Sequence, residues 1–146
     1  MNQETVKNRV LEKAIDLERF SKELSQVLPK TTDEYKKSNI LVKSTVERRL
    51  QLISDTEIDI LAILYKELKL NIAGEDFSLI SIFSEIFKNN VNEKIRRLRE
   101  IRNKLIHEYK SEQFDEEVFK VASENLDESD VISEIKHIVN TKLNNI

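Results

Sequence analysis

Residues 96–109 read RRLREIRNKLIHEY, and this basic segment is the most informative part of the sequence. It contains one of the two histidines of the chain. Between Lys88 and Lys110 there are eight Lys or Arg residues against three acids, a formal charge of +5 in a chain of net −3. A histidine titrates near neutral pH, and fixed cations beside it can stabilise negative charge on a phosphodiester. The segment therefore indicates chemistry on a phosphate group.

Apolar residues recur every three or four positions through this segment, which is typical of an amphipathic α-helix. We predict a helix with Asn92 as its N-cap and its end within residues 107–109. Arg102 occupies a position in the apolar stripe where a leucine would be expected. A charge in an apolar seam is costly unless it is paired or hydrated, so this position is predicted to serve more than folding. The alternative is a structural ion pair with Glu47 or Asp59.

Outside the basic segment the sequence has few helix breakers. One Gly and one Pro in 146 residues predict an all-α fold, with no internal repeats. Apolar periodicity predicts helices at residues 4–28, 33–70, 78–88, 92–109 and 115–124, followed by a last helical segment. We expect an up-down bundle of about five helices that forms one domain over residues 1–146.

The second predicted helix, residues 33–70, is unusually long. It follows Pro29, and Thr31 and Glu34 have the spacing of a capping box. At 1.5 Å per residue the helix would extend for about 55 Å, more than a bundle of this size needs. We therefore expect it either to kink near Ser54-Asp55-Thr56 or to pack partly against another chain.

Composition narrows the class of protein. The absence of cysteine excludes disulfides and thiolate metal sites. The first residues are polar, and no apolar run approaches the ~20 residues of a membrane span, so a soluble cytoplasmic protein is expected. The net charge of −3 argues against a general polyanion binder but permits a local basic groove. Residues 111–146 are acidic, with nine Asp or Glu against three lysines.

The spacing of Arg102, His107 and Tyr109 gives the pattern R-x4-H-x-Y, with Asn103 in the first variable position. This pattern, near the end of a basic helix in an all-helical chain, resembles the HepT toxins, a branch of the HEPN family of small helical ribonucleases. The resemblance implies a HEPN-like homodimer whose motifs line a cleft between protomers. It also implies a type VII toxin–antitoxin system, with tRNA as a candidate substrate. The partner would be an MntA-like minimal nucleotidyltransferase antitoxin that transfers AMP to Tyr109.

The residues themselves suggest how such a site would work. His107 would serve as general base or acid, and Arg102 would bind the phosphate and stabilise the transition state. The 2′-hydroxyl of RNA can attack the adjacent phosphate, so neither a metal nor a cofactor is required. Asn103 is four residues before His107 and could orient its imidazole. An RNA-backbone track is predicted at Arg96, Arg97, Arg99, Lys104 and Lys110.

Helical geometry sets a condition on this site. Residues 102 and 107 would lie ~140° apart on a regular helix and could not share a face. The helix must therefore end or distort before His107, or a second chain must complete the site. Tyr109 at a helix end would offer an exposed hydroxyl to a modifying partner.

Several alternatives remain open from the sequence. The basic residues could form an ordinary solvated helix face, and His107 could be a C-terminal histidine favoured by the helix dipole. His137, in the acidic region, is predicted to lie on the surface. The alternative function is a non-catalytic helical subunit that binds a substrate or nucleotide for a minimal nucleotidyltransferase. A purely structural helical dimer is a third possibility.

Overall fold

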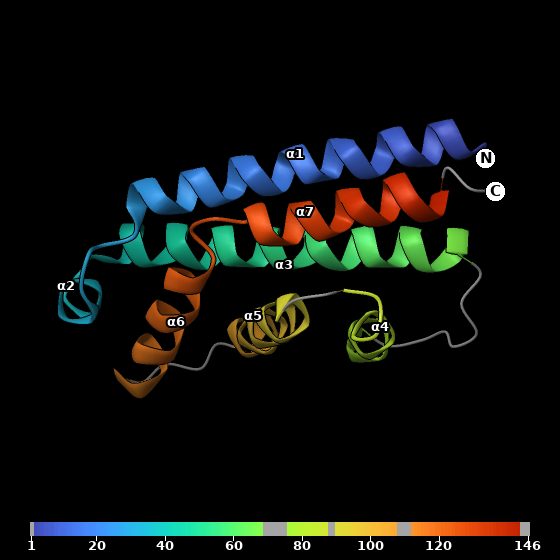
Figure 1. The fold of residues 1–146 in the computed structure, drawn as a ribbon. Helices are drawn as coiled ribbons and strands as arrows, with labels where there is room; N and C mark the ends of the chain where they lie inside the picture. The colour runs from blue at the N-terminus through green and yellow to red at the C-terminus, as the bar shows by residue number, and fades with distance from the viewer. Residues whose placement is uncertain (1, 69–75, 88–89, 108–111, 144–146) are drawn as a thin grey trace.

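The computed structural model describes residues 2–68, 76–87, 90–107 and 112–143 (Figure 1). Within these ranges the chain is helical and contains no β-strand, which confirms the predicted all-α class. The elements are α1 Gln3–Val27, α2 Thr32–Lys36, α3 Ile40–Leu68, α4 Asp76–Phe83, α5 Val91–Ile106, α6 Glu112–Glu124, α7 Ser129–Ile138 and a π-helical turn, η1, Val139–Leu143.

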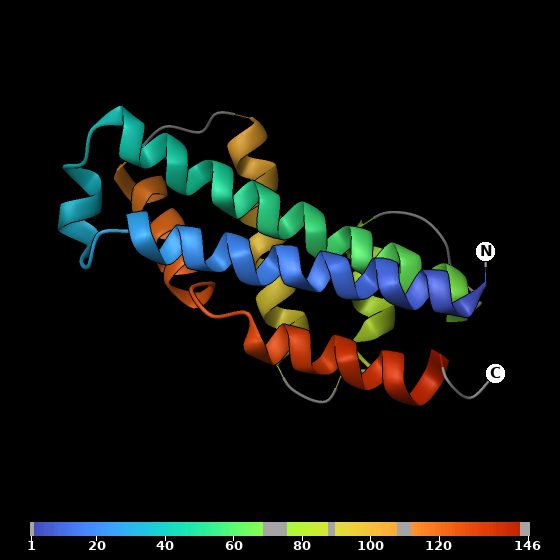
Figure 2. The same cartoon turned by 90° about the horizontal axis from the view of Figure 1, so that it is seen from above.

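The helices form two layers. In one layer α1, α3 and α7 run side by side, and α1 and α3 are antiparallel over most of their length (Figures 1 and 2). In the other layer α4 and α5 run across α3, and α6 contacts α2 and α5. Figure 2 shows that the N-terminal end of α5 lies toward α7, whereas its C-terminal end extends past α3. The crossing of α5 over α3 positions the candidate site.

One cluster of buried hydrophobic residues joins every helix among the described residues. Leu24 of α1, Leu50 of α3, Phe83 of α4 and Leu98 of α5 are each fully buried within it. Burying a side chain of this size contributes about 1.5–3 kcal/mol. The amphipathic stripes predicted from sequence are therefore the faces that hold the layers together. None of the helices in the described ranges has the length and apolar character needed to span a bilayer.

The predicted helix at residues 33–70 is two helices, α2 and α3. The break falls at Lys37–Asn39, where the Ser38 hydroxyl donates to the Glu34 carbonyl (2.7 Å) and the Asn39 side chain accepts from Val42 N–H (3.0 Å). The alternative of a kink near Ser54–Thr56 is wrong, because α3 continues as one helix through these residues. Since α1 covers α3 along its length, packing within the chain accounts for the length of α3.

Two predicted caps differ from the structure, while a third is confirmed. Thr31 caps α2 by accepting from Glu34 N–H (3.1 Å). Asn92 is not an N-cap but lies buried inside α5, where its side-chain amide donates to the Ile80 carbonyl (2.9 Å) and joins α5 to α4. Asp115 lies within α6, which begins three residues earlier, and pairs with Lys43 of α3 (3.1 Å).

Candidate functional site

The C-terminal half of α5 places two arginines against one carboxylate of α3. The Nε group of Arg102 donates to Asp55 Oδ1 (2.9 Å), and Nη1 of Arg99 donates to the same oxygen (2.8 Å). Nη1 of Arg99 also lies 3.3 Å from the Ser54 hydroxyl. Arg99 is buried, at 6% exposure, whereas 23% of the Arg102 side chain is exposed. The charge in the apolar seam is thus paired and only partly covered.

The acidic partner of Arg102 is neither of the two residues expected from sequence. Asp59, one turn beyond Asp55 on α3, pairs with Lys13 of α1 (3.5 Å). Asp55 takes the predicted role because it lies where α5 crosses α3. The alternative reading of Arg102 as part of an ion pair is therefore correct in kind, with a different partner.

His107 is the C-cap of α5 and is exposed. Its backbone (φ −85°, ψ 6°) departs from the helix, and its N–H donates to the Lys104 carbonyl (3.1 Å). The helix therefore ends at Ile106, directly before His107, but the φ of His107 is still close to helical, so its side chain leaves the helix in a direction well apart from that of Arg102. Completion of the site by a second chain, the other condition set by the spacing, stays a prediction.

Asn103 is turned toward the arginine. Its side-chain oxygen lies 3.4 Å from Nη1 of Arg102, at the long end of hydrogen-bonding distance. The predicted contact between Asn103 and His107 is not among the hydrogen bonds of the described residues, so this side chain is better placed to support Arg102. Tyr109 and Lys110 lie outside the described residues.

Of the described residues in the predicted basic track, one is buried and the others have hydrogen-bond or ion-pair partners. Arg99 is buried at the crossing and is not part of an exposed track. Arg96 donates to the Ser81 hydroxyl (3.1 Å). On the exposed side, Arg97 pairs with Glu124 (2.6 Å) and Lys104 pairs with Glu117 (3.1 Å), and both acids belong to α6.

These two pairs explain part of the acidity of the C-terminal third. The side chains of Arg97 and Lys104 are 43% and 47% exposed, so both remain accessible to solvent. Exposed pairs of this kind contribute only about 0–1 kcal/mol, and a phosphate could displace either carboxylate. The acids of α6 therefore moderate the positive charge of α5 without removing it.

A second polar cluster lies near the N-terminal end of α5, and no sequence pattern predicted it. Lys94 Nζ donates to the Asp127 carbonyl (2.8 Å) and to Asp130 (2.9 Å), and lies 3.8 Å from Glu128. Glu57 of α3 is buried against Glu128. The cluster joins α5 and α3 to the turn between α6 and α7.

Protonation would reduce the repulsion between the two buried carboxyls of this cluster. Burial, together with the charge of and a hydrogen bond to Glu128, raises the pKa of Glu57 well above its usual value. Burial also raises the pKa of Glu128 to about 7, although Lys94 acts in the opposite direction. With both carboxyls ionised, their four oxygens would lack a hydrogen-bond donor. A proton shared between Glu57 and Glu128 supplies that donor.

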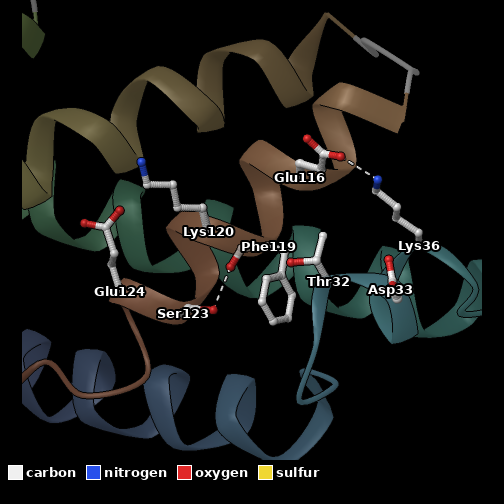
Figure 3. Close-up of a pocket in the computed structure, with 8 residues that line it drawn as sticks. All are labelled: Thr32, Asp33, Lys36, Glu116, Phe119, Lys120, Ser123 and Glu124. Carbon is white, nitrogen blue, oxygen red and sulfur yellow. Dashed lines mark hydrogen bonds and ion pairs between the residues drawn. The ribbon is translucent and has the colours of Figure 1, made fainter.

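Two hollows of the surface lie away from this crossing. Figure 3 shows the pocket between α2 and α6, which is lined by Phe119 and crossed by an ion pair between Lys36 and Glu116. The second lies between α1 and α7 and includes His137, which is exposed as predicted. Among the described residues, no three His, Asp or Glu side chains are arranged to hold a metal ion.

An all-helical fold that carries an arginine and a histidine at the end of a basic helix is the arrangement expected of a small helical ribonuclease. Residues 11–138 match a family model described as "Ribonuclease HepT-like". The match covers most of the 146 residues, so the chain belongs to the HepT-like ribonuclease family. No curated protein sequence matches the chain significantly.

Proposed function

We propose that the chain is a metal-independent endoribonuclease toxin in which Arg102 and His107 act on the RNA backbone. The observation that carries this proposal is the placement of Arg102, which is fixed at the α3–α5 crossing yet partly exposed, five residues before the exposed His107. The family match supports a ribonuclease.

The proposed reaction is an internal transfer at phosphorus. His107 removes the proton of the 2′-hydroxyl, and the 2′-oxygen attacks the adjacent phosphorus atom. The bond to the 5′-oxygen of the next nucleotide breaks, and that oxygen takes up a proton. Arg102 stabilises the negative charge that develops on the non-bridging oxygens. The products are a 2′,3′-cyclic phosphate and a 5′-hydroxyl end, so DNA would not be a substrate.

The decisive experiment measures cleavage of total RNA by purified protein in the presence of EDTA. Wild-type protein should cleave, and His107→Ala should reduce the rate at least 100-fold. His137→Ala is the matched control, because this second exposed histidine lies on α7, and should cleave like the wild type. Cleavage that requires added magnesium would contradict the metal-independent reaction.

The role of Arg102 is tested separately. Arg102→Lys keeps the charge but loses the planar fork that binds a phosphate through two donors. We expect the rate to fall about 100-fold, as for the loss of one transition-state donor. A rate within twofold of the wild type would exclude Arg102 from the reaction.

We further propose that the active form is a homodimer and that an MntA-like nucleotidyltransferase inactivates it by transferring AMP to Tyr109. Light scattering at micromolar concentration should give the mass of a dimer. Intact-mass measurement after co-expression should show added adenylyl groups, and Tyr109→Phe should remove them. A monomeric mass, or modification that persists in Tyr109→Phe, would contradict the respective proposal.

The second candidate function is the non-catalytic binding subunit. The pairing of Arg97 and Lys104 with acids of α6 favours it, because these cations are already partly neutralised. This reading requires that unmodified wild-type protein cleave no RNA. Growth arrest on expression that is relieved by His107→Ala would exclude it.

A further inference from the structure

We propose that Asp55 is a positioning residue for the ribonuclease site, and that it orients the guanidinium of Arg102 toward a phosphate. The proposal rests on the function proposed above. Asp55 lies 47 residues before Arg102 in sequence, on a different helix, and no part of the R-x4-H-x-Y pattern includes it.

The geometry of the hydrogen bond determines which edge of Arg102 is available. A guanidinium is planar and carries five donors in fixed directions. Asp55 Oδ1 accepts from Nε (2.9 Å), and Asn103 lies near Nη1 (3.4 Å). Nη2 has no hydrogen-bond partner among the described residues. Binding through Nε thus fixes the plane of the group while leaving at least one donor for a ligand.

Asp55 does not hold Arg102 alone. Its Oδ1 also accepts from Arg99, so Arg102 shares one carboxylate oxygen with a second guanidinium. The exposed Arg97, by contrast, pairs with Glu124. Because Arg102 is only 23% exposed, its interaction with a phosphate would be screened less than that of a surface arginine.

Asp55 is carried by a continuous helix that is packed on its buried side. Asp55 lies in the middle of α3, which is unbroken over 29 residues, and the preceding residues Ile53 and Ser54 are buried. Arg99, which shares the carboxylate, is itself buried and limits the freedom of Asp55. A transition-state donor held in this way needs no reordering when substrate binds. The same carboxylate thus holds α5 against α3 and orients the guanidinium of Arg102.

The kinetic test uses Asp55→Asn, which keeps the shape and one acceptor oxygen but removes the charge. We expect kcat for RNA cleavage to fall about 10- to 100-fold with KM changed less than about threefold, because Arg102 acts mainly in the transition state. Asp55→Glu should recover part of the lost rate. Asp59→Asn is the matched control, since Asp59 is one turn away on α3 but pairs with Lys13 of α1 rather than with α5, and it should leave kcat unchanged.

A second measurement follows Arg102 directly and does not depend on activity. In nitrogen-15 spectra of arginine side chains, the Nε–H signal of Arg102, assigned by its loss in Arg102→Lys, should exchange slowly with water. Slow exchange should persist in Asp59→Asn and be lost in Asp55→Asn, with both variants still folded at the temperature of the measurement, as shown by cooperative melting. If Asp55→Asn unfolds, Asp55→Glu carries the same two readouts.

The outcomes separate the two proposals. Unchanged kcat and unchanged Nε–H exchange in Asp55→Asn would overturn the positioning role. Loss of Nε–H protection together with a reduced kcat would establish it. If wild-type protein cleaves no RNA but the Nε–H protection depends on Asp55, the ribonuclease function fails while the orientation of Arg102 by Asp55 stands.

Discussion

The two ends of α5 are both fastened to α3 by charged side chains, but with opposite balance. Near the N-terminal end, one cation, Lys94, faces the acids Glu57, Glu128 and Asp130 in a mostly buried cluster. Near the C-terminal end, the arginines 99 and 102 face one acid, Asp55, and the cluster is partly open. The buried acids of the first end have raised pKa values that favour a bound proton, whereas at the second end two arginines share one oxygen of Asp55 and Arg102 is partly exposed.

This difference in charge suggests different roles for the two ends of α5. A buried, acid-rich cluster that holds its own proton can join helices but offers nothing to a phosphate. A cation-rich cluster at the surface can bind an anion and still hold its helix in place. The same helix therefore combines a structural anchor, the cluster of Lys94 with Glu57, Glu128 and Asp130, with a candidate site around Arg102. The two should respond differently to mutation and to pH.

The largest expected effect comes from breaking the anchor with Lys94→Met. Removing the cation leaves buried carboxyls without their partner, and losses of about 3–5 kcal/mol are typical for a broken buried pair. We expect urea denaturation at pH 8 to show a loss of this size and a smaller loss at pH 5, where the acids are protonated. Lys22→Met is the control, since its pair with Glu18 is exposed, and should cost less than about 0.5 kcal/mol. Equal losses for both variants would refute the distinction.

The next effect is on the dependence of stability on pH. The folded-state pKa of Glu128 is about 7 and that of Glu57 is also raised, so the native state binds protons more tightly than the unfolded state. The contribution of these two carboxyls to the free energy of unfolding is therefore fully present below about pH 4.5. It is lost as the pH rises through 7, which lowers the free energy of unfolding by on the order of 3 kcal/mol. Glu57→Gln should flatten this dependence and make the protein more stable than the wild type at pH 8.

The control for this prediction is Glu100→Gln, an exposed glutamate on α5. Its denaturation midpoints between pH 5 and 8 should follow those of the wild type. A wild-type stability that rises over this range would mean that Glu57 and Glu128 are not protonated together in the native state.

The smallest expected effect concerns the exposed ion pairs between α5 and α6. Glu117→Gln with Glu124→Gln frees Lys104 and Arg97 and should change stability by less than about 1 kcal/mol. In a His107→Ala background, fluorescence anisotropy should show a few-fold tighter RNA binding at low salt. Each freed cation that contacts a phosphate should steepen the dependence of log K on log salt by about 0.7 for single strands.

The matched control on the same helix is Glu116→Gln, because Glu116 pairs with Lys36 of α2 rather than with α5. RNA binding by this variant should equal that of the parent protein. If all three glutamine substitutions raise affinity equally, the effect is one of net charge and not of the paired cations on α5.

The fold class and most helix positions were predictable because they depend on local patterns. The end of α1 before Pro29 and the Thr31 cap follow from the chemistry of one or two residues. The break at Lys37–Asn39 was missed because it contains neither Gly nor Pro; Asn39, a cap residue, was the available signal. Asn92 was misassigned for the opposite reason, since a good cap residue can also serve a buried tertiary hydrogen bond.

The candidate site was predictable only along one helix. Arg102 stood out because a charge interrupted an apolar stripe, and the sequence required a partner for it. Which acid fills that role depends on where α5 crosses α3, and periodicity does not determine a crossing point. The burial of Arg99 and the pairing of Arg97 with Glu124 depend on the same tertiary arrangement. Local sequence thus identifies candidate residues, whereas packing decides which of them reach solvent.

The anchor at Lys94 also has a consequence for the order in which the protein forms during synthesis. Helices α1 and α3 come from the first 68 residues and can pair early, because their contacts need no later part of the chain. Lys94, in contrast, is held by Asp127, Glu128 and Asp130, which are made more than 30 residues later. We expect chains that stop after Glu124 to resist protease less well in α5 than in α1 and α3. The Lys94 contacts are thus among the last of the described contacts of α5 to be completed, after those with α3, α4 and α6.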